Sequence, residues 1–361
     1  MAMSLKEFLE EWNSPSETVL VQTSGSTGAP KPMLVEKSRM LASARRTNDF
    51  LGLREGDTAL LCMSLDYIAG KMMVVRALER GLRLITVSPS GHPLQTLRDG
   101  SSLFDGKSHV MVKQKRTVPR CLNICFTAMV PMQVYNSLQV PEERERLMQI
   151  LHLIIGGGAI DDALAAELKS FPNAVWSTYG MTETLSHIAL RRLSGTNASN
   201  WYTPFPSVTV SLSEEDTLII DAPEVCAEPL ITNDIADLTL GPDSSVRFRI
   251  LGRKDNVICS GGLKIQAEEL ERQLRPHLCV PYLITKRPDE KFGEIVVLLT
   301  EGSIEDARQI CERILPKFHQ PRSYYHVNHI PLTATGKPAR HEAERLAISL
   351  PDGKVAKRPE D

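Results

Sequence analysis

The sequence predicts an α/β protein with a large N-terminal domain of mainly parallel sheets and a small β subdomain, followed by a smaller, mobile α+β domain at the C-terminus. In the first half of the chain, short apolar runs alternate with helix-like segments, which is typical of a parallel sheet covered on both faces. After residue 200 the runs become short and β-rich, with turn residues between them. A second alternation of helix-like and strand-like segments follows residue 256.

The parallel sheet is expected from apolar runs of strand length. The expected strands are 18–23 (TVLVQT), 58–63 (TALLCM), 82–87 (LRLITV), 121–127 (CLNICFT), 151–158 (LHLIIGGG) and 174–180 (AVWSTYG). The segments between them have helical length, as in EKSRMLASARRTNDFLG, YIAGKMMVVRALERG and DDALAAELKSF. Because parallel strands need crossover connections, we expect these helices to cover both faces of the sheet.

The second half of the chain is expected to hold the β subdomain and the smaller domain. The runs PSVTVSL, DTLIID, DIADLTL and VRFRILG indicate the β subdomain. The predicted division is an N-terminal domain at 1–251, a hinge at 252–256, a C-terminal lid domain at 257–350 and a tail at 351–361. Because the tail has few apolar residues, we expect it to be disordered.

The bulk composition excludes several classes of protein. With 361 residues and a formal net charge of -2, the chain lacks the basic excess of a nucleic-acid or membrane-surface protein. No run reaches the roughly 18 uninterrupted apolar residues that a membrane-spanning helix needs, and the acidic N-terminus lacks the pattern of a signal peptide. The 7 cysteines are scattered without a CxxC pair, which indicates buried, reduced thiols and a cytoplasmic location.

The segment TSGSTGAPK at 23–31 combines glycines, hydroxyls and a lysine. Gly25 and Gly28 allow positive φ and close approach of a ligand. Hydroxyl donors around the charge of Lys31 suit a polyphosphate. A flexible turn between two strands is the alternative interpretation.

The P-loop of nucleoside triphosphatases, GxxxxGK[ST], is the nearest rival of this loop. Here the spacing is G-x-x-G-x-x-K, and Lys31 is followed by Pro32 and a strand-like MLV. A P-loop instead continues with Ser or Thr and a helix. The segment is therefore not a P-loop.

Five segments resemble, in the same order, motifs of the adenylate-forming enzymes, which include acyl- and aryl-CoA ligases, luciferases and nonribosomal adenylation domains. TSGSTGAPK resembles their signature loop, and STYGMTETLSHIAL (177–190) their adenine- and magnesium-contacting motif. ITNDIADL (231–238) resembles their ribose-binding segment. RILGRKDNVICSGGLKIQAEELE (249–271) is similar to their hinge and thiol tunnel, and PLTATGKPAR (331–340) to their C-terminal lysine loop. The likeness covers nearly the whole chain.

The resemblance implies a two-step ligase that uses ATP, Mg²⁺ and coenzyme A. A carboxylate attacks the α-phosphate of ATP to give an acyl-adenylate and pyrophosphate, and the thiol of CoA then displaces AMP. Positioning and charge neutralisation should dominate such a reaction, because neither step needs a protein nucleophile. By this resemblance, the loop residues that hold the β- and γ-phosphates are Thr23, Ser24, Gly25, Ser26, Thr27, Gly28 and Lys31.

The second motif is implied to contact adenine, the α-phosphate and the metal. Tyr179 would stack on adenine beside Gly180, Thr182 would contact the α-phosphate, and Glu183 would bind magnesium. A hard cation prefers a carboxylate together with phosphate oxygens, so Glu183 suits this role. A solvated turn residue is the alternative interpretation of Glu183.

The third and fourth motifs are implied to bind ribose and to form the hinge. Asp234 has two acceptor oxygens for paired ribose hydroxyls, Arg253 would contact the ribose, and Asp255 would act as the hinge. Asn233 stands where the family has glycine. Because asparagine tolerates the left-handed conformation better than most residues, we expect the turn to be kept.

The remaining residues are implied to serve the thiol, the acyl group and the adenylation step. Gly261 and Gly262 would leave room for the pantetheine arm, and Gly157 and Gly158 would line the wall between the acyl and adenine pockets. Lys337 would neutralise the charge that develops on the carboxylate and the α-phosphate. The alternatives are ordinary glycine turns and a solvated surface lysine.

Within the family, the sequence most resembles the o-succinylbenzoate–CoA ligases of menaquinone biosynthesis. SLDYIAGKMMVVRAL, FTAMVPMQV and LHLIIGGGAI carry this likeness. In the first of these segments, Tyr67 stands where the family has a histidine. An o-succinylbenzoate has a second carboxylate that needs a donor or a cation, and the candidates by residue type are Lys71, His187 and Lys264.

The chain also departs from the family in length. Only 22 residues precede Thr23, so we expect part of the N-terminal domain to be missing or compressed. A shortened but complete active site is favoured, and a homodimer that covers an exposed sheet edge is the alternative. Two other functions stay open: the same chemistry on another acid or a carrier-protein thiol, and a non-catalytic nucleotide-binding protein.

Overall fold

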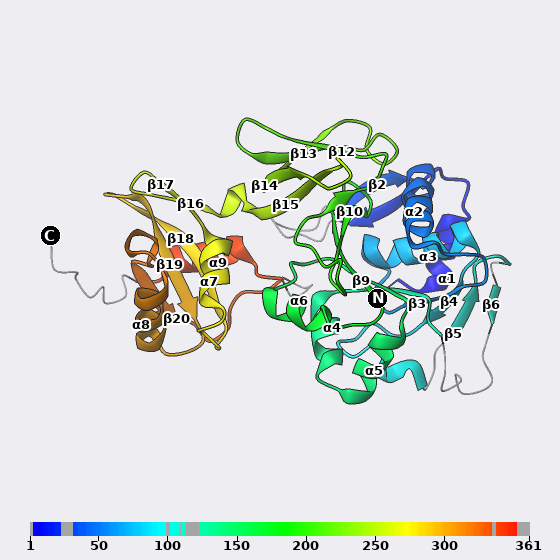
Figure 1. Ribbon diagram of the computed structural model, residues 1–361, viewed down its shortest axis with the longest axis horizontal. Helices are drawn as coiled ribbons and strands as arrows, with labels where there is room; N and C mark the ends of the chain where they lie inside the picture. Colours follow the sequence, from blue (N-terminus) through cyan, green and yellow to red (C-terminus); the bar gives the residue numbers. More distant parts are fainter. Residues whose placement is uncertain are drawn as a thin grey trace.

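The computed structural model describes residues 3–22, 32–98, 102–108, 110–112, 123–333 and 337–351. The predicted phosphate loop and most of the predicted tail lie outside these ranges. Figure 1 shows a large lobe in blue to green and a small lobe in yellow to red. Within the described ranges, the predicted α/β class is confirmed.

A nine-stranded mixed sheet forms the centre of the large lobe. Its strands, in spatial order, are β11 (Thr203–Pro204), β10 (His187–Arg192), β9 (Ala174–Gly180), β8 (His152–Ile155), β7 (Phe126–Met129), β3 (Thr58–Leu61), β4 (Arg83–Thr86), β5 (Ser102–Asp105) and β6 (Val110–Val112). The central strands from β9 to β4 are parallel. The strands added at both edges are antiparallel. The predicted parallel sheet is therefore the middle of a wider mixed sheet.

Helices cover both faces of this sheet because its central strands are apolar on both sides. In β3, Ala59 and Leu61 pack into one core, whereas Leu60 packs into the other. The first core also contains residues of α1 (Leu5–Trp12), α2 (Lys37–Leu51) and α3 (Ile68–Arg80). The second contains residues of α4 (Pro131–Leu138), α5 (Pro141–Gln149) and α6 (Asp162–Leu168). Proline in the first turn of α4 and of α5 fits helices that begin there.

The first expected strand does not belong to the parallel sheet. β1 (Thr18–Gln22) pairs with β2 (Pro32–Glu36) in a separate antiparallel sheet, with Gln22 opposite Pro32. Val19 and Val21 are buried while Leu20 is 46% exposed. This alternation is that of a strand covered on one face only. The expected strand at 18–23 is therefore present but belongs to a different sheet.

The β subdomain has the predicted strands. β12 (Thr209–Leu212), β13 (Thr217–Asp221), β14 (Leu230–Leu240) and β15 (Val246–Arg253) form a four-stranded antiparallel sheet in chain order. Its buried residues, such as Leu218 and Phe248, belong to the core that also holds α2 and α3. The subdomain thus packs on the large lobe, and β15 ends where the predicted hinge begins.

The small lobe has its own sheet and cores. Its strands are β16 (Val257–Ser260), β17 (Leu263–Gln266), β18 (Tyr282–Asp289), β19 (Gly293–Thr300) and β20 (Ser323–His326). Its helices are α7 (Ala267–Leu274), α8 (Ile304–Ile314) and α9 (Arg340–Ser349). Three short 3-10 helices are also described: η1 (Gln95–Arg98) in the large lobe, η2 (Lys254–Asn256) between the lobes and η3 (Lys317–His319) in the small lobe. Among the described residues, the two small-lobe cores begin at Ile258 and share no member with those of the large lobe. The domain limits and the hinge at 252–256 stay predictions.

Two further expectations concern membrane crossing and thiols. No helix within the described ranges is long and apolar enough to span a membrane. The described cysteines are all free thiols. Cys259 and Cys279 are exposed, however, so the expectation that the thiols are buried is wrong for these two.

Candidate functional site

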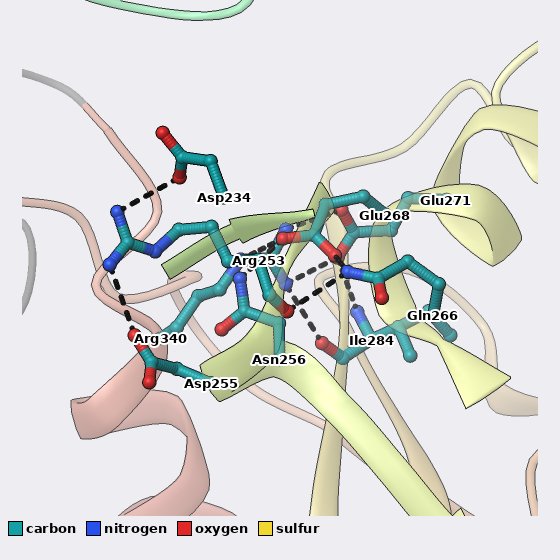
Figure 2. A network of polar contacts seen from close by, with 9 residues as sticks. All are labelled: Asp234, Arg253, Asp255, Asn256, Gln266, Glu268, Glu271, Ile284 and Arg340. Atoms are coloured by element: carbon teal, nitrogen blue, oxygen red, sulfur yellow. Dashed lines mark hydrogen bonds and ion pairs between the residues drawn. The ribbon is translucent and has the colours of Figure 1, made fainter. Parts of the chain in front are cut away.

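A polar cluster lies where the end of β9 meets the β subdomain. Tyr179 Oη donates a hydrogen bond to Asp234 Oδ2 over 2.6 Å, and Arg253 Nη1 lies 3.4 Å from Asp234 Oδ1. Asp234 and Arg253 are cross-strand partners in the β14–β15 pair, so strand pairing sets this ion pair. Figure 2 shows Arg253 between Asp234 and Asp255. The structure therefore brings together three residues that were predicted to hold the nucleoside.

The Tyr179 side chain is 9% exposed and lies among aromatic rings. Its ring centroid is 5.0 Å from that of Phe248 and 5.8 Å from that of Tyr202. Burial and the Asp234 carboxylate raise the pKa of Tyr179 well above its ordinary value. The hydroxyl therefore stays protonated and acts as a donor to Asp234. Stacking of Tyr179 on adenine stays a prediction.

The segment that was predicted to be the hinge is joined to this cluster through Asp255. Asp255 Oδ2 lies 3.0 Å from Arg253 Nη2, and Asn233 Nδ2 lies 3.3 Å from each Asp255 oxygen. The expected left-handed turn at Asn233 is wrong, because Asn233 lies within β14 and is not among the described residues with positive φ. Its amide instead binds Asp255, which a glycine could not do.

Lys337 belongs to the small lobe and is half-buried. Burial and the positive charge of Arg253 lower the pKa of Lys337. The backbone around it is held by bonds from Thr333 N to Lys337 O, over 2.7 Å, and from Lys337 N to Thr333 Oγ1, over 3.1 Å. Residues 334–336, including Gly336, lie outside the described ranges. A partly desolvated ammonium suits the neutralisation of developing charge.

The connection between β9 and β10 carries Thr182 and Glu183. Thr184 organises it: its hydroxyl accepts from Met181 N over 2.9 Å and lies 2.7 Å from Ser186 O. Thr182 is 8% exposed, whereas Glu183 is exposed. The turn therefore presents the Glu183 carboxylate to the outside, and contact of Thr182 with an α-phosphate stays a prediction.

Gly180 begins this turn at a position that has no room for a side chain. A Cβ atom there would lie 2.2 Å from Ser186 O and 2.5 Å from His187 Cα. We expect Gly180→Ala to destabilise the protein by about 1–3 kcal/mol or more, because backbone atoms must move. Gly158→Ala is the control, since its Cβ would meet Pro131 no closer than 3.5 Å. Thermal unfolding of both variants measures the difference, and equal melting temperatures would contradict the prediction.

Gly157 and Gly158 follow β8 at the sheet edge that also carries the end of β9. Both are exposed, and Gly157 has a φ of +80°, which favours glycine. Because β8 and β9 are parallel neighbours, these glycines and Tyr179 belong to the same edge. Their role as a pocket wall stays a prediction.

Glu183 fits the way in which proteins bind magnesium with a nucleotide. Among the described residues no cluster of three or more His, Cys, Asp or Glu side chains could hold a metal. Mg²⁺ is usually held by one or two carboxylates together with phosphate oxygens, and not by an all-protein cage. An exposed carboxylate such as Glu183 therefore suffices in principle.

The structure gives Lys71 a different role from the predicted one. Its side chain is 3% exposed, donates to Leu20 O over 2.6 Å and lies 3.6 Å from Glu11 Oε2. Its ammonium also lies 5.5 Å from the ring centroid of Phe8. Lys71 thus joins α3 to α1 and β1, and it has no free face for a substrate carboxylate.

His187 is likewise a core residue and not a free donor. It is 6% exposed, with Nε2 3.1 Å from Thr47 Oγ1 and Nδ1 3.3 Å from Ser186 Oγ. Burial and the charges of Arg76 and Arg46 lower its pKa well below the ordinary value. His187 is therefore neutral, and the prediction that it binds a substrate carboxylate is wrong.

The buried neutral His187 predicts a pH dependence of stability. Below the unfolded-state pKa of about 6.5, the unfolded chain binds a proton that folded His187 does not. The free energy of unfolding should therefore fall as pH drops from 7 to 5, with this residue contributing up to about 1.4 kcal/mol per pH unit. Urea unfolding should show a shallower fall for His187→Gln and an unchanged one for the exposed His329→Gln. Parallel slopes in wild type and His187→Gln would contradict the assignment.

The other predicted pocket and tunnel residues lie on α3 and on the β16–β17 hairpin. Tyr67 is half-buried at the N-cap of α3, and Lys264 is exposed on β17. Gly261 and Gly262 form the turn of the β16–β17 hairpin, with φ of +58° and +85°. Positive φ at both positions is what a two-residue hairpin turn requires. The turn explains both glycines structurally, and their role toward a thiol stays a prediction.

The sequence analysis missed a buried arginine beneath the β9–β10 turn. Arg76 is 2% exposed on α3, and its Nη2 donates to Ser186 Oγ over 2.7 Å. Burial lowers its pKa to about 9. An arginine inside the apolar run MMVVRAL was the available signal, because an unpaired buried charge is costly.

A known protein family and several known sequences match most of the chain. The family model described as AMP-binding enzyme matches residues 4–228. A 2-succinylbenzoate–CoA ligase of Enterococcus faecalis is 25% identical, over 94% of this chain and 72% of that protein. Another from Bacillus cytotoxicus is 24% identical, over 93% of this chain and 72% of that protein.

Solved structures show a similar fold. An acyl-CoA synthetase (AMP-forming)/AMP-acid ligase II-like protein from Dyadobacter fermentans has a TM-score of 0.59 and 28% identity, covering 93% of this chain and 92% of that chain. O-succinylbenzoate coenzyme A synthetase from Bacillus subtilis, in complex with ATP and magnesium ion, has a TM-score of 0.67 and 20% identity. That match covers 90% of this chain and 69% of the other.

Proposed function

The chain belongs to the AMP-binding enzyme family, and on this premise we propose that it is an ATP-dependent acid–thiol ligase that forms an acyl-adenylate and then an acyl-CoA thioester. The observation that supports this most strongly is the environment of Lys337. This lysine of the small lobe is partly desolvated, and burial together with the charge of Arg253, which pairs with Asp234, lowers its pKa. An amine delivered to a nucleoside site from a second lobe suits the neutralisation of charge during adenylation.

In the proposed first step, an oxygen of the substrate carboxylate attacks the α-phosphorus of ATP. The bond to pyrophosphate breaks, and the acid becomes a mixed anhydride with AMP. Asp234 accepts from the ribose hydroxyls and Lys337 neutralises the developing charge. Glu183 would hold Mg²⁺, which offsets the charge of the phosphates. The segment from Thr23 to Lys31 is proposed to bind the β- and γ-phosphates.

In the proposed second step, the sulfur of a thiolate attacks the acyl carbon and AMP leaves. The thiol is proposed to be that of coenzyme A, with Gly261 and Gly262 beside the pantetheine arm. Both glycines lie in the hairpin that directly follows η2. Rotation of the small lobe about Asp255 would bring this hairpin to the adenylate, because a polar joint between lobes with separate cores can turn.

The acid is proposed to be o-succinylbenzoate, which would place the enzyme in menaquinone biosynthesis. Two relatives named 2-succinylbenzoate–CoA ligase, each matched over more than 90% of this chain, support this substrate. Another aryl or acyl acid, or a carrier-protein thiol, is the alternative. A cytoplasmic location belongs to the same proposal, and a homodimer is a secondary one.

Pyrophosphate release across a panel of aryl and acyl acids, with and without CoA, tests the proposal. We expect ATP-dependent release with o-succinylbenzoate and a CoA thioester as the final product. Release with a different acid would change the substrate but keep the chemistry. Absence of ATP–pyrophosphate exchange with every acid would instead indicate a nucleotide-binding protein without catalytic activity.

A further inference from the structure

Arg340 begins α9 three residues after Lys337, and its guanidinium is held by α7. Nη1 lies 3.0 Å from Glu271 Oε1, and Nη2 lies 2.7 Å from Glu271 Oε2. Such a bidentate pair fixes direction as well as distance. The two side chains are only 22% and 11% exposed, so water screens the pair little. Burial opposes the charge of Arg340, but Glu271 outweighs it and raises the pKa.

The Arg340–Glu271 pair also binds the sheet of the small lobe. Arg340 Nη1 donates to Ile284 O over 3.2 Å, and Glu271 Oε1 accepts from Ile284 N over 3.0 Å. Figure 2 shows both side chains meeting at this backbone position of β18. The start of α9 is therefore fixed to α7 and β18 at one point, and the lysine loop is anchored there.

A second carboxylate of α7 extends this network to the segment between the lobes. Glu268 lies one helical turn before Glu271, with Oε1 3.8 Å from Arg340 Nε. The same oxygen accepts from Asn256 Nδ2, and Glu268 Oε2 accepts from Gln266 Nε2 over 2.5 Å. Gln266 Nε2 also donates to Arg253 O over 3.1 Å. The network thus runs without interruption from Arg340 to the backbone of Arg253.

We propose that Arg340 is a positioning residue for adenylation: held by Glu271 and Glu268, it orients the backbone at 337–340 that carries Lys337 and ties it to the segment at 252–256. This inference rests on the proposed function, because it assigns Lys337 to the first step only. The other described bonds around Lys337 join it to Thr333 and join Ala339 N to Pro331 O, all within one short segment, so Arg340 supplies a connection of this segment to α7 and β18. A purely structural ion pair would instead affect both steps equally.

The test compares the two half-reactions in Arg340→Gln, Arg340→Lys, Glu271→Gln and Glu294→Gln. Glu294 is the matched control, because it also accepts a backbone N–H, from Cys259 over 2.7 Å, and pairs with a cation, Lys286, over 2.9 Å. ATP–pyrophosphate exchange measures the first step, and thioester formation from pre-made acyl-adenylate measures the second. Thermal unfolding shows whether each variant is folded.

We expect Arg340→Gln and Glu271→Gln to lower the kcat of pyrophosphate exchange by about 10- to 100-fold, as a displacement of about 1 Å does. The KM for ATP and the second half-reaction should change by less than about threefold, because the nucleoside contacts of Asp234 are untouched. Arg340→Lys should recover part of the rate, since lysine keeps the charge but not the bidentate geometry. Glu294→Gln should exchange pyrophosphate as wild type does.

Equal losses in both half-reactions, or a loss in Glu294→Gln as large as in Glu271→Gln, would overturn the inference. If Arg340→Gln does not fold, Glu271→Gln decides, because it keeps the arginine and removes only the charge of its partner. Wild-type protein that exchanges no pyrophosphate with any acid would refute the proposed function itself, which is a different result from an unselective effect of the variants.

Discussion

Lys337→Ala should lower the rate of acyl-adenylate formation by about 10²- to 10³-fold, as the loss of one preorganised donor to a developing negative charge does. Lys337 is partly desolvated and experiences the charge of Arg253, so its own charge acts more strongly than it would in water. Thioester formation from pre-made acyl-adenylate should be largely kept, because the charge on the α-phosphate has already passed. Single-turnover assays of the two half-reactions provide the measurement.

The exposed lysine at the β18–β19 turn offers a control for this result. Lys291→Ala removes the same charge from the same lobe and should leave both steps unchanged. The lowered pKa of Lys337 adds a second readout: its cation is lost as pH rises, so adenylation should fall at a lower alkaline pH than an exposed lysine would give. Equal losses in both half-reactions of Lys337→Ala would refute its role.

Asp234→Asn should raise the KM for ATP by roughly 10- to 100-fold, since hydrogen bonds to a charged group contribute about 1.5–3 kcal/mol. The substitution keeps the shape of the side chain but removes the charge that Arg253 and Tyr179 both contact. It also replaces an oxygen acceptor for a ribose hydroxyl by an amide donor. Initial rates of pyrophosphate release at varied ATP concentration measure the change.

Asp237→Asn is a closely matched control for Asp234→Asn. Asp237 lies on the same strand, and Asp237 Oδ2 is 2.6 Å from Nη2 of its cross-strand partner Arg249. This pair resembles the Asp234–Arg253 pair but makes no contact with Tyr179. The KM for ATP should stay within about twofold of wild type in Asp237→Asn, because an exposed pair contributes little. A similar KM in both variants would exclude Asp234 from the nucleotide site.

The strands in the first half of the chain were predicted with varying accuracy from their apolar runs. The run 174–180 forms β9 with the predicted limits. The run 121–127 is less accurate, because the strand β7 begins only at Phe126. The run 18–23 was assigned to the wrong sheet, because an apolar run indicates a strand but not the strand with which it pairs.

The residues of the candidate site could be predicted better than their arrangement in space. Tyr179, Asp234 and Arg253 were selected by likeness to family motifs, and the structure joins them. Asn233 was expected in a left-handed turn, yet it lies within a strand and binds Asp255. Asn233 is extended because β14 pairs with β13 and β15, and such pairing is not specified by the segment alone.

The sequence by itself determined the fold class, because this follows from local periodicity. It also determined the order of the motifs and their residue types, which were identified by likeness to a family. Only the tertiary structure decided which polar residues are free to act. Lys71 and His187 are buried and hydrogen-bonded to partners 51 and 140 residues away, and Arg340 meets Glu271 across 69 residues. The availability of a charged side chain depends on its burial and its partners in space, and neither is set by its neighbours in the chain.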